Sequence, residues 1–331
     1  MQIQNKKVLI LGCNSFSATV CSRYIRQQGL QVFGATRGNH FPNPYKAELG
    51  MQESSIYVLG DNFNPNDILD ICESEKITHV INFVAESMVA QSWMQPEKWY
   101  ETNVKWISRL ISALNSWGKI EKFLQYTTPE VYGSNNQWQT ESWNFYPSTP
   151  YAISRAAGDW HLYSMGKEFN FPVVFTRTAN IYGPHQPLYR VVPKALMMAK
   201  RGERFTLEGD GKSIRSFIHM EDVARAVLSV LLNGKLLETY HISTQTTITT
   251  LELLVKIYSL YGLDFQDYVS RLPERKGKDA AYMLDSSKIR KEIGWSDEID
   301  IDYGLELTKN WIDQEFLTLR NLPLLYEERQ S

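Results

Sequence analysis

The chain has 331 residues, of which 43% are hydrophobic and 22% are charged, and its formal net charge is -2. This length allows one large or two ordinary domains with a substantial core. The balanced charge and the lack of a long basic run argue against a nucleic-acid-binding surface, and no apolar run is long enough to span a bilayer. Three cysteines without metal-ligand spacing predict a reduced, cytoplasmic setting.

The first predicted element is a buried strand over residues 8–11, followed by a glycine turn and a helix that ends near Gly29. This order opens a dinucleotide-binding unit, in which the cofactor pyrophosphate lies at the helix N-terminus. A G-x-x-G-x-x-G loop would have three glycines, but this chain has Gly12, Ser15 and Ala18. Alanine is tolerated at the third position, whereas Ser15 would narrow the approach to the pyrophosphate. Taken alone, the loop is equally consistent with a structural turn.

The second strand is predicted over residues 31–35 and is followed by Thr36 and Arg37. In this type of fold, an acidic residue at the end of the second strand binds the adenosine ribose of NAD and repels a 2′-phosphate. Arg37 would instead pair with a 2′-phosphate, so the sequence favours NADP over NAD. The alternative is an exposed arginine in a loop.

Strands then alternate with helices as far as residue 178. Further strands are predicted over residues 55–59, 79–84, 123–126 and 172–178, and helices over residues 66–75, 96–117 and 150–168. This alternation predicts an α/β fold, with a Rossmann-like doubly wound parallel sheet in a cofactor-binding domain over residues 1–178. The helix over residues 96–117 has more apolar positions than one stripe needs, which indicates contact with a second subunit or complete burial.

The central stretch of the chain holds residues that could carry out a proton transfer. Thr149 and Pro150 predict the start of a helix, which places Tyr151 and Arg155 one above the other on one face. A nearby cation favours the phenolate form of a tyrosine. With the hydroxyl of Thr128 on the same substrate oxygen, this set could remove a proton from an alcohol while a hydride leaves its carbon. A surface tyrosine on an amphipathic helix is the alternative.

The remaining residues, 179–331, predict a smaller mixed α/β domain that closes over the site, with parts such as residues 216–243 returning to the first domain. Arg190, Arg215 and Arg275 lie in or beside loops, which suits the binding of an anionic substrate. For any one of these arginines alone, solvated charge is the simpler interpretation.

Together these motifs resemble the extended short-chain dehydrogenase/reductase family, and within it the nucleotide-sugar 4,6-dehydratases. The resemblance covers nearly the whole chain and rests on these segments: Gly12 and its loop, Ala85-Glu86-Ser87, Thr102-Asn103, Thr128 to Gly133, Tyr151 in the Y-x-x-x-K position, Asn180 to Pro184, Arg215, and Arg275-x-Gly277-x-Asp279. It implies oxidation of the sugar at C4, removal of the C5 proton by a glutamate, loss of the C6 hydroxyl as water and return of the hydride to C6. The product would be a 4-keto-6-deoxy sugar nucleotide.

The resemblance also implies roles for individual residues. The catalytic set would be Thr128, Glu130, Tyr151 and Arg155. The cofactor would contact Gly12, Asn14, Ser15, Phe16, Ser17, Arg37, Asp61, Asn62, Val84, Ala85, Asn103, Tyr151 and Arg155. The nucleotide-diphosphate sugar would contact Ser87, Asn180, Arg190, Arg215 and Arg275. As in family members, the helices over residues 96–117 and 150–168 would pair with their copies in a homodimer; no metal site is expected.

Three residues depart from the pattern of the family. Pro129 stands where many thymidine-sugar dehydratases have an aspartate that acts as acid on the leaving hydroxyl, and proline can neither donate nor accept a proton there. Guanosine-mannose dehydratases and decarboxylases of the family also lack this aspartate. Arg155 replaces a lysine with a side chain of different shape and reach, and Ser15 replaces a glycine. An epimerase, a decarboxylase or a cofactor-binding pseudoenzyme are therefore the alternatives to a dehydratase.

Overall fold

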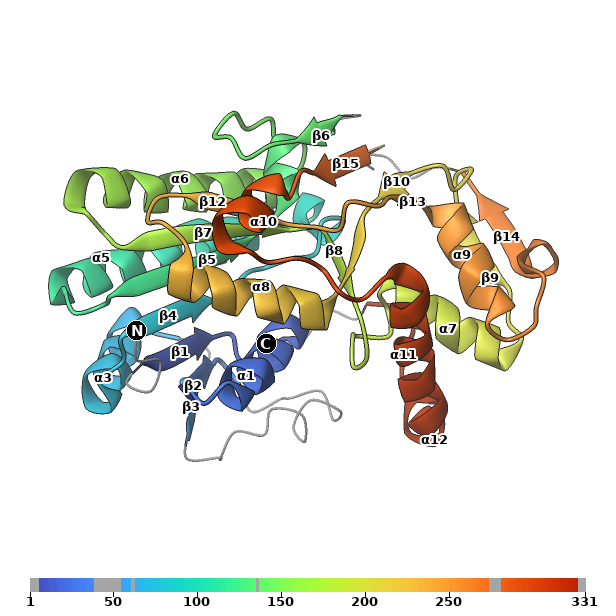
Figure 1. Cartoon of the computed structure of the whole chain (residues 1–331), viewed down its shortest axis with the longest axis horizontal. Helices are drawn as coiled ribbons and strands as arrows, with labels where there is room; N and C mark the ends of the chain where they lie inside the picture. The colour runs from blue at the N-terminus through green and yellow to red at the C-terminus, as the bar shows by residue number, and fades with distance from the viewer. Residues whose placement is uncertain (1–5, 39–54, 61–62, 135–136, 274–280, 327–331) are drawn as a thin grey trace.

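A parallel sheet of seven strands forms the larger part of the computed structural model, which describes residues 6–38, 55–60, 63–134, 137–273 and 281–326 (Figure 1). The strands are β1 (Lys7–Leu11), β2 (Gln31–Thr36), β3 (Ile56–Val58), β4 (His79–Asn82), β5 (Lys122–Thr127), β7 (Val173–Thr178) and β12 (Thr239–Ile242). Their order in the sheet is β12-β7-β5-β4-β1-β2-β3, and every neighbouring pair is parallel. The predicted Rossmann-like α/β fold is confirmed.

Helices cover both faces of this sheet (Figure 1). They are α1 (Phe16–Gln27) and α8 (Met220–Asn233) on one face, and α3 (Pro65–Glu75), α5 (Ile107–Trp117) and α6 (Pro150–Phe169) on the other. Val8 and Ile10 of β1 belong to the core with α1 and α8, whereas Leu9 and Leu11 belong to the core with α3, α5 and α6. Alternate residues of a strand point to opposite faces, so burial of both faces explains the continuous apolar run of β1.

The helix expected over residues 96–117 is divided into three pieces. A short α4 (Pro96–Tyr100) leads into a π-helical segment, η4 (Glu101–Trp106), and only then into α5. Such π-helical turns add a residue to the turn and are frequent at functional sites. Here the wide turn contains Asn103, which is buried and whose amide is held by hydrogen bonds described below.

The smaller part of the molecule packs around a separate core. Its main helices are α7 (Val191–Arg201), α9 (Thr250–Ser259) and α11 (Ile301–Gln314), followed by the short α12 (Phe316–Leu319). Leu196, Leu254 and Ile312, one from each main helix, are fully buried in this core. In contrast, α10 (Ser287–Ile293) packs in the core of the larger part, where Ile289 is buried. The segment that contains α8 and β12 leaves the smaller part, because α8 packs on the seven-stranded sheet and β12 pairs with β7.

Further short strands form three small sheets, and the sequence did not predict them. A four-stranded sheet has the order β13-β10-β15-β6, and the pairs β11-β8 and β14-β9 form two small sheets. Their bounds are β6 (Trp138–Gln139), β8 (Asn180–Tyr182), β9 (Phe205–Glu208), β10 (Ile214–Arg215), β11 (Phe217–His219), β13 (Ile248–Thr249), β14 (Val269–Leu272) and β15 (Ala281–Leu284). Strands this short are set by their partners, since they are too short to show a hydrophobic period.

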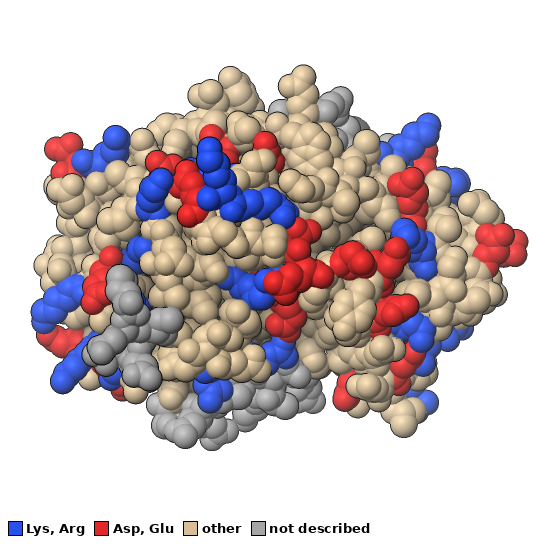
Figure 2. All heavy atoms as spheres, in the orientation of Figure 1, with Lys and Arg blue, Asp and Glu red and all other residues tan. Residues whose placement is uncertain are grey.

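The surface is mixed in charge. On the face shown in Figure 2, Lys and Arg side chains lie interspersed with Asp and Glu side chains, and the formal net charge of the chain is -2. Within the described residues, no helix combines the length and apolar character that crossing a bilayer requires.

Candidate active site

The glycine turn after β1 lies where the carboxyl ends of three strands meet. Gly12 has a φ of +73°, and a Cβ on it would lie 3.3 Å from both the backbone nitrogen and the Cγ2 atom of Val84. The amide of Gly12 donates to the carbonyl of Ala35 at 2.9 Å, which ties the turn to the end of β2. Only glycine adopts this conformation without strain. The turn lies beside the point between β1 and β4 where the strand order reverses, which is where dinucleotides bind in such sheets.

Ser15 acts as the N-cap of α1 and so fits a position where the family pattern has glycine. Its backbone is extended, with φ -86° and ψ 156°, and its Oγ accepts from the amide of Ala18 at 3.4 Å. The amide of Ser15 itself donates to the carbonyl of Gly12 at 3.0 Å. A serine is a preferred N-cap, and no left-handed conformation is needed here. Ser15, which the sequence predicts would narrow the approach to the pyrophosphate, therefore has a structural role as the cap that starts the helix.

Thr128, Glu130 and Tyr151 gather at the end of β5. Thr128 is the N-cap of η5 (Pro129–Tyr132), and its Oγ1 accepts from the amide of Glu130 at 3.3 Å. Tyr151 lies in the first turn of α6, which begins at Pro150 because Thr149 caps it by accepting from the amide of Ala152 at 3.1 Å. Both Thr128 and Tyr151 are buried. The carboxyl end of the strand and the amino end of the helix thus bring together residues 23 positions apart.

The hydroxyl of Tyr151 is surrounded by opposing influences on its pKa. Burial is the largest and raises the pKa, and the carboxylate of Glu130 raises it further. The guanidinium of Arg155, a hydrogen bond with Thr128 and the charge of Arg190 lower it. The net direction is upward, so the lowering by Arg155 that the sequence predicts is present but is outweighed by desolvation. Four of the predicted residues, Thr128, Glu130, Arg155 and Arg190, thus act on the hydroxyl of Tyr151.

Arg155 is held in a way that a lysine would not reproduce. Its Nη2 atom donates to the backbone carbonyl of Tyr126 on β5 at 2.5 Å, and the side chain is buried. The guanidinium therefore ties α6 to the end of β5 one turn from Tyr151. An ammonium group presents its three donors at one nitrogen, whereas the planar guanidinium spreads five donors over three nitrogens and can contact this carbonyl and a more distant ligand together.

Asn103, a predicted cofactor contact, fixes the segment that follows β4. Its Oδ1 accepts from the amide of Glu86 at 2.9 Å, and its Nδ2 donates to the carbonyl of Glu86 at 3.0 Å and to the Oγ of Ser154 on α6 at 2.9 Å. A Cβ on Gly158 of α6 would collide with the backbone carbonyl of Asn103. Close packing of the π-helical segment against α6 thus sets the position of Val84, Ala85 and Glu86.

The other predicted contacts lie in several places. Asn14 and Ser17 lie with Phe16 in the turn and first residues of α1, and Ser87 is exposed after β4. Asn180 begins β8 opposite Phe217, Arg190 is the N-cap of α7, and Arg215 lies on β10, where its Nη1 donates to the carbonyl of Ile214 at 2.7 Å. Asp61, Asn62 and Arg275 lie outside the described residues. Of the two described arginines predicted for the substrate, Arg190 is the one whose charge lowers the pKa of Tyr151.

A buried ion pair behind the catalytic turn was not predicted. Arg177 and Asp159 have fully buried side chains, with Nη1 and Oδ2 2.5 Å apart. The same Asp159 oxygen accepts from the hydroxyl of Thr127 at 3.0 Å, and Arg177 also donates to the carbonyl of Thr128 at 3.4 Å. The pair therefore supports the backbone that carries Thr128 and Glu130. A signal was present in the sequence, because Arg177 interrupts the apolar run of a strand that is buried on both faces.

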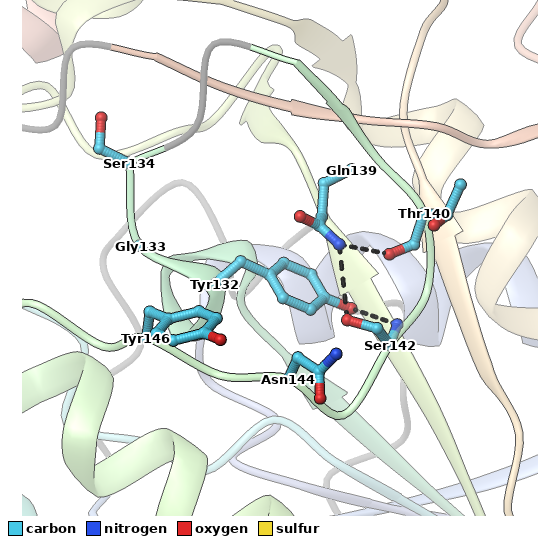
Figure 3. A pocket seen from close by; sticks show the side chains of 8 residues that line it. All are labelled: Tyr132, Gly133, Ser134, Gln139, Thr140, Ser142, Asn144 and Tyr146. Carbon is cyan, nitrogen blue, oxygen red and sulfur yellow. Dashed lines mark hydrogen bonds between the residues drawn. The ribbon is translucent and has the colours of Figure 1, made fainter.

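A polar cleft of roughly 540 Å³ lies beyond this turn, and its lining is drawn in Figure 3. The ring of Tyr132 lies in its wall, and the tyrosine hydroxyl accepts from the amide of Ser142 at 3.4 Å. Gln139 donates to the carbonyl of Thr140 at 2.8 Å across the same loop. None of the predicted site residues lines this cleft. Within the part of the chain that the structure describes, no group of His, Cys, Asp or Glu side chains is placed to hold a metal ion.

The glycine turn at the strand-order switch, together with the tyrosine, threonine and cation at the ends of β5 and α6, defines a nicotinamide-dependent enzyme of the short-chain dehydrogenase/reductase class. The chain belongs to the NAD dependent epimerase/dehydratase family, and the sequence model of this family matches residues 8–243. The family predicted from the sequence motifs is thereby confirmed.

The relatives in sequence include several proteins named as 4,6-dehydratases. The chain is 34% identical to dTDP-glucose 4,6-dehydratase of Streptomyces niveus over 251 residues, which cover 73% of this chain and 74% of that protein. It is 30% identical to dTDP-D-glucose 4,6-dehydratase of Bos taurus over 271 residues, which cover 80% and 76%. A trifunctional UDP-glucose 4,6-dehydratase of Arabidopsis thaliana is 28% identical over 316 residues, but this chain spans only 47% of its length.

Among solved structures, the dTDP-glucose 4,6-dehydratase DesIV of Streptomyces venezuelae, which has NAD bound, is similar with a TM-score of 0.83. It is 27% identical to this chain, and the match covers 93% of this chain and 97% of DesIV. A UDP-glucose 4-epimerase of Thermotoga maritima is similar with a TM-score of 0.85 at 22% identity, covering 94% and 99% of the two chains, and shares the fold.

Proposed function

We propose that this protein is a nicotinamide-dependent nucleotide-sugar 4,6-dehydratase. The observation that carries the proposal is the presence of Glu130 within electrostatic reach of the Tyr151 hydroxyl, at the carboxyl end of a central strand. Oxidation alone needs only the tyrosine and its cation. A carboxylate beside them supplies the second proton transfer that an elimination requires. The relatives named as 4,6-dehydratases support the same reaction.

The described residues fit a nicotinamide dinucleotide. The N-terminus of α1, with its positive dipole end, favours an anion such as a pyrophosphate, and Gly12 leaves open the space that a Cβ would fill against Val84. Arg37, at the end of β2, supports NADP as the preferred cofactor, with NAD as the alternative. When bound, the nicotinamide ring would accept a hydride from C4 of the sugar and return it at C6.

The side chains carry out the proton transfers and orient the substrate. Tyr151, as phenolate, takes the proton of the C4 hydroxyl, and Thr128 hydrogen-bonds the same oxygen. The C4 ketone acidifies the neighbouring C5 proton, which Glu130 removes as the C6 hydroxyl leaves. Since Pro129 has no proton to give, Glu130 also returns the proton that converts this hydroxyl to water. When the hydride is returned to C6, C5 takes up a proton from solvent in place of the one it lost, and Tyr151 releases to solvent the proton that it took from the C4 hydroxyl. Arg190, at the start of α7, would orient the nucleotide diphosphate above them.

The reaction is tested by incubating the protein with thymidine, uridine and guanosine diphosphate sugars and measuring the masses of the products by mass spectrometry. Loss of water from one of them is the expected result. An unchanged mass with altered stereochemistry would identify an epimerase, and loss of carbon dioxide a decarboxylase. Binding of cofactor and sugar nucleotide without any product would identify a pseudoenzyme. Each of these three outcomes would overturn the dehydratase proposal.

Arg155→Lys should lower the dehydration rate roughly 10- to 150-fold, because a hydrogen bond from a charged donor contributes about 1.5–3 kcal/mol and the lysine would lose the contact with Tyr126. Arg155→Met should lower it further, since the positive charge that favours the phenolate of Tyr151 is also lost. Steady-state rates of the two variants, measured with saturating cofactor, provide the comparison. Equal rates for wild type and Arg155→Lys would show that Arg155 serves only as a cation.

We also propose that the protein is a cytoplasmic homodimer, formed through α4 and α6. Exposed apolar side chains on these helices include Tyr100, Ile153 and Phe169, which are 38%, 44% and 58% accessible. Light scattering at micromolar concentration should give the mass of two chains, and Ile153→Arg should give a single chain. Val255→Arg is the matched control, because Val255 is 38% exposed on α9 in the smaller part. A monomeric wild type would refute this assembly.

A further inference from the structure

An ion pair crosses the crevice where the adenosine end of the cofactor would lie. Strands β2 and β4 flank β1 on opposite sides, so their ends are separated by two strand spacings, roughly 10 Å. Arg37 follows β2 directly, and Glu86 lies in the segment after β4. The Nη2 atom of Arg37 and the Oε1 atom of Glu86 are 3.1 Å apart. The two side chains therefore bridge the carboxyl end of β1, above the turn at Gly12.

The two partners differ in how firmly they are held. The backbone of Glu86 is fixed on both its amide and its carbonyl by the buried Asn103, and its side chain is 28% exposed. Arg37 comes from the end of a strand, and its side chain is 54% exposed. The backbone that carries the Glu86 carboxylate is thus held in place, and the more exposed guanidinium of Arg37 pairs with this carboxylate.

We propose that Glu86 is the residue that limits the preference for NADP over NAD, by competing with the 2′-phosphate for Arg37. This inference rests on the proposed function in so far as it requires a nicotinamide dinucleotide at the Gly12 turn. A 2′-phosphate must take Arg37 from Glu86 and must also bring its charge close to that carboxylate. NAD carries no such group and leaves the pair intact. A prediction from Arg37 alone therefore overestimates the selectivity for NADP over NAD.

The test is the ratio of the dissociation constants of NADP+ and NAD+, measured by calorimetry without any sugar. Glu86→Gln should tighten NADP+ binding roughly tenfold, about the 1.4 kcal/mol that a tenfold change represents, and should change NAD+ binding by less than about twofold. Arg37→Ala should weaken NADP+ binding only. In the double variant the gain from Glu86→Gln should vanish, because Glu86 acts through Arg37. Raising the salt concentration should reduce the effect of Glu86→Gln.

Glu73→Gln is the matched control. Glu73 pairs with Lys119 at 3.4 Å on the surface, with exposed fractions of 68% and 63%, so this variant removes the same charge from an ion pair elsewhere. It should leave the cofactor ratio unchanged. An unchanged ratio in Glu86→Gln, or a gain that persists after Arg37→Ala, would overturn the inference.

The inference and the proposed function can fail separately. A shifted ratio in a protein that dehydrates no sugar would support the role of Glu86 and refute the dehydratase. If the protein dehydrates a sugar nucleotide but Glu86→Gln does not shift the ratio of the dissociation constants, the dehydratase is supported and the role of Glu86 is refuted. Failure to bind either dinucleotide would refute both.

Discussion

Replacement of Tyr151 by phenylalanine should lower the rate of dehydration by roughly 10²–10⁴-fold, the usual contribution of a positioned acid or base. Only the hydroxyl is removed, so the buried ring still fills its site at the start of α6. Because the proton transfer at C4 comes first, reduction of the bound cofactor by the substrate should disappear together with product formation. Absorbance of the reduced nicotinamide and the mass of the product measure the two steps.

Tyr163→Phe is the control for Tyr151→Phe, since it removes a hydroxyl from the same helix, α6, at a ring that packs on Trp143. It should retain the wild-type rate. The pH dependence adds a second check. Burial raises the pKa of Tyr151, and the phenolate is the active form, so the rate of oxidation should rise as the pH is raised toward that pKa. A rate that persists in Tyr151→Phe would exclude this residue as the base.

Replacement of Glu130 by glutamine should separate oxidation from elimination. The amide has nearly the same shape but cannot take the C5 proton, so dehydration should fall by roughly 10²–10⁴-fold, while the substrate still reduces the cofactor. A keto-sugar, or cofactor trapped in its reduced form, should accumulate in a rapid-quench experiment. The effect should be large because Pro129 leaves no second carboxylate in this turn to substitute for Glu130.

Glu306→Gln, which removes an exposed carboxylate from α11, is the control for Glu130→Gln and should behave as wild type. Unimpaired dehydration by Glu130→Gln would refute the role of Glu130 and would favour an epimerase. Loss of both cofactor reduction and dehydration would place Glu130 in the first step, contrary to the division of labour proposed here.

The elements of the large sheet could be predicted because each has a strong local signal. The strand at residues 8–11 is buried on both faces, so it appears as an unbroken apolar run, and α6 begins where Thr149 and Pro150 predict it. The π-helical segment at Glu101–Trp106 was not predicted, and its Asn103 makes hydrogen bonds to the backbone of Glu86, 17 positions away. The local sequence pattern does not indicate contacts between residues so far apart in the chain.

The same limit explains what the sequence revealed about the site. Thr128, Glu130 and Tyr151 stand in a recognisable order, so their grouping could be expected from motifs. The partners of the charged residues could not be predicted from motifs. Arg37 contacts Glu86, and Arg155 contacts the carbonyl of Tyr126, only because the folded sheet brings distant segments together. Each contact changes what the arginine can do. Arg37 is shared with a carboxylate, and Arg155 is tied to the backbone of β5.

The most direct measurement of the central claim uses a nucleotide sugar labelled with deuterium at C4. If the protein oxidises C4, eliminates water and returns the same hydride to C6, the product will have lost water and kept the deuterium, now on C6. Mass spectrometry combined with proton NMR locates the label. A product of unchanged mass, or one that has lost water without retaining the deuterium, would contradict the account.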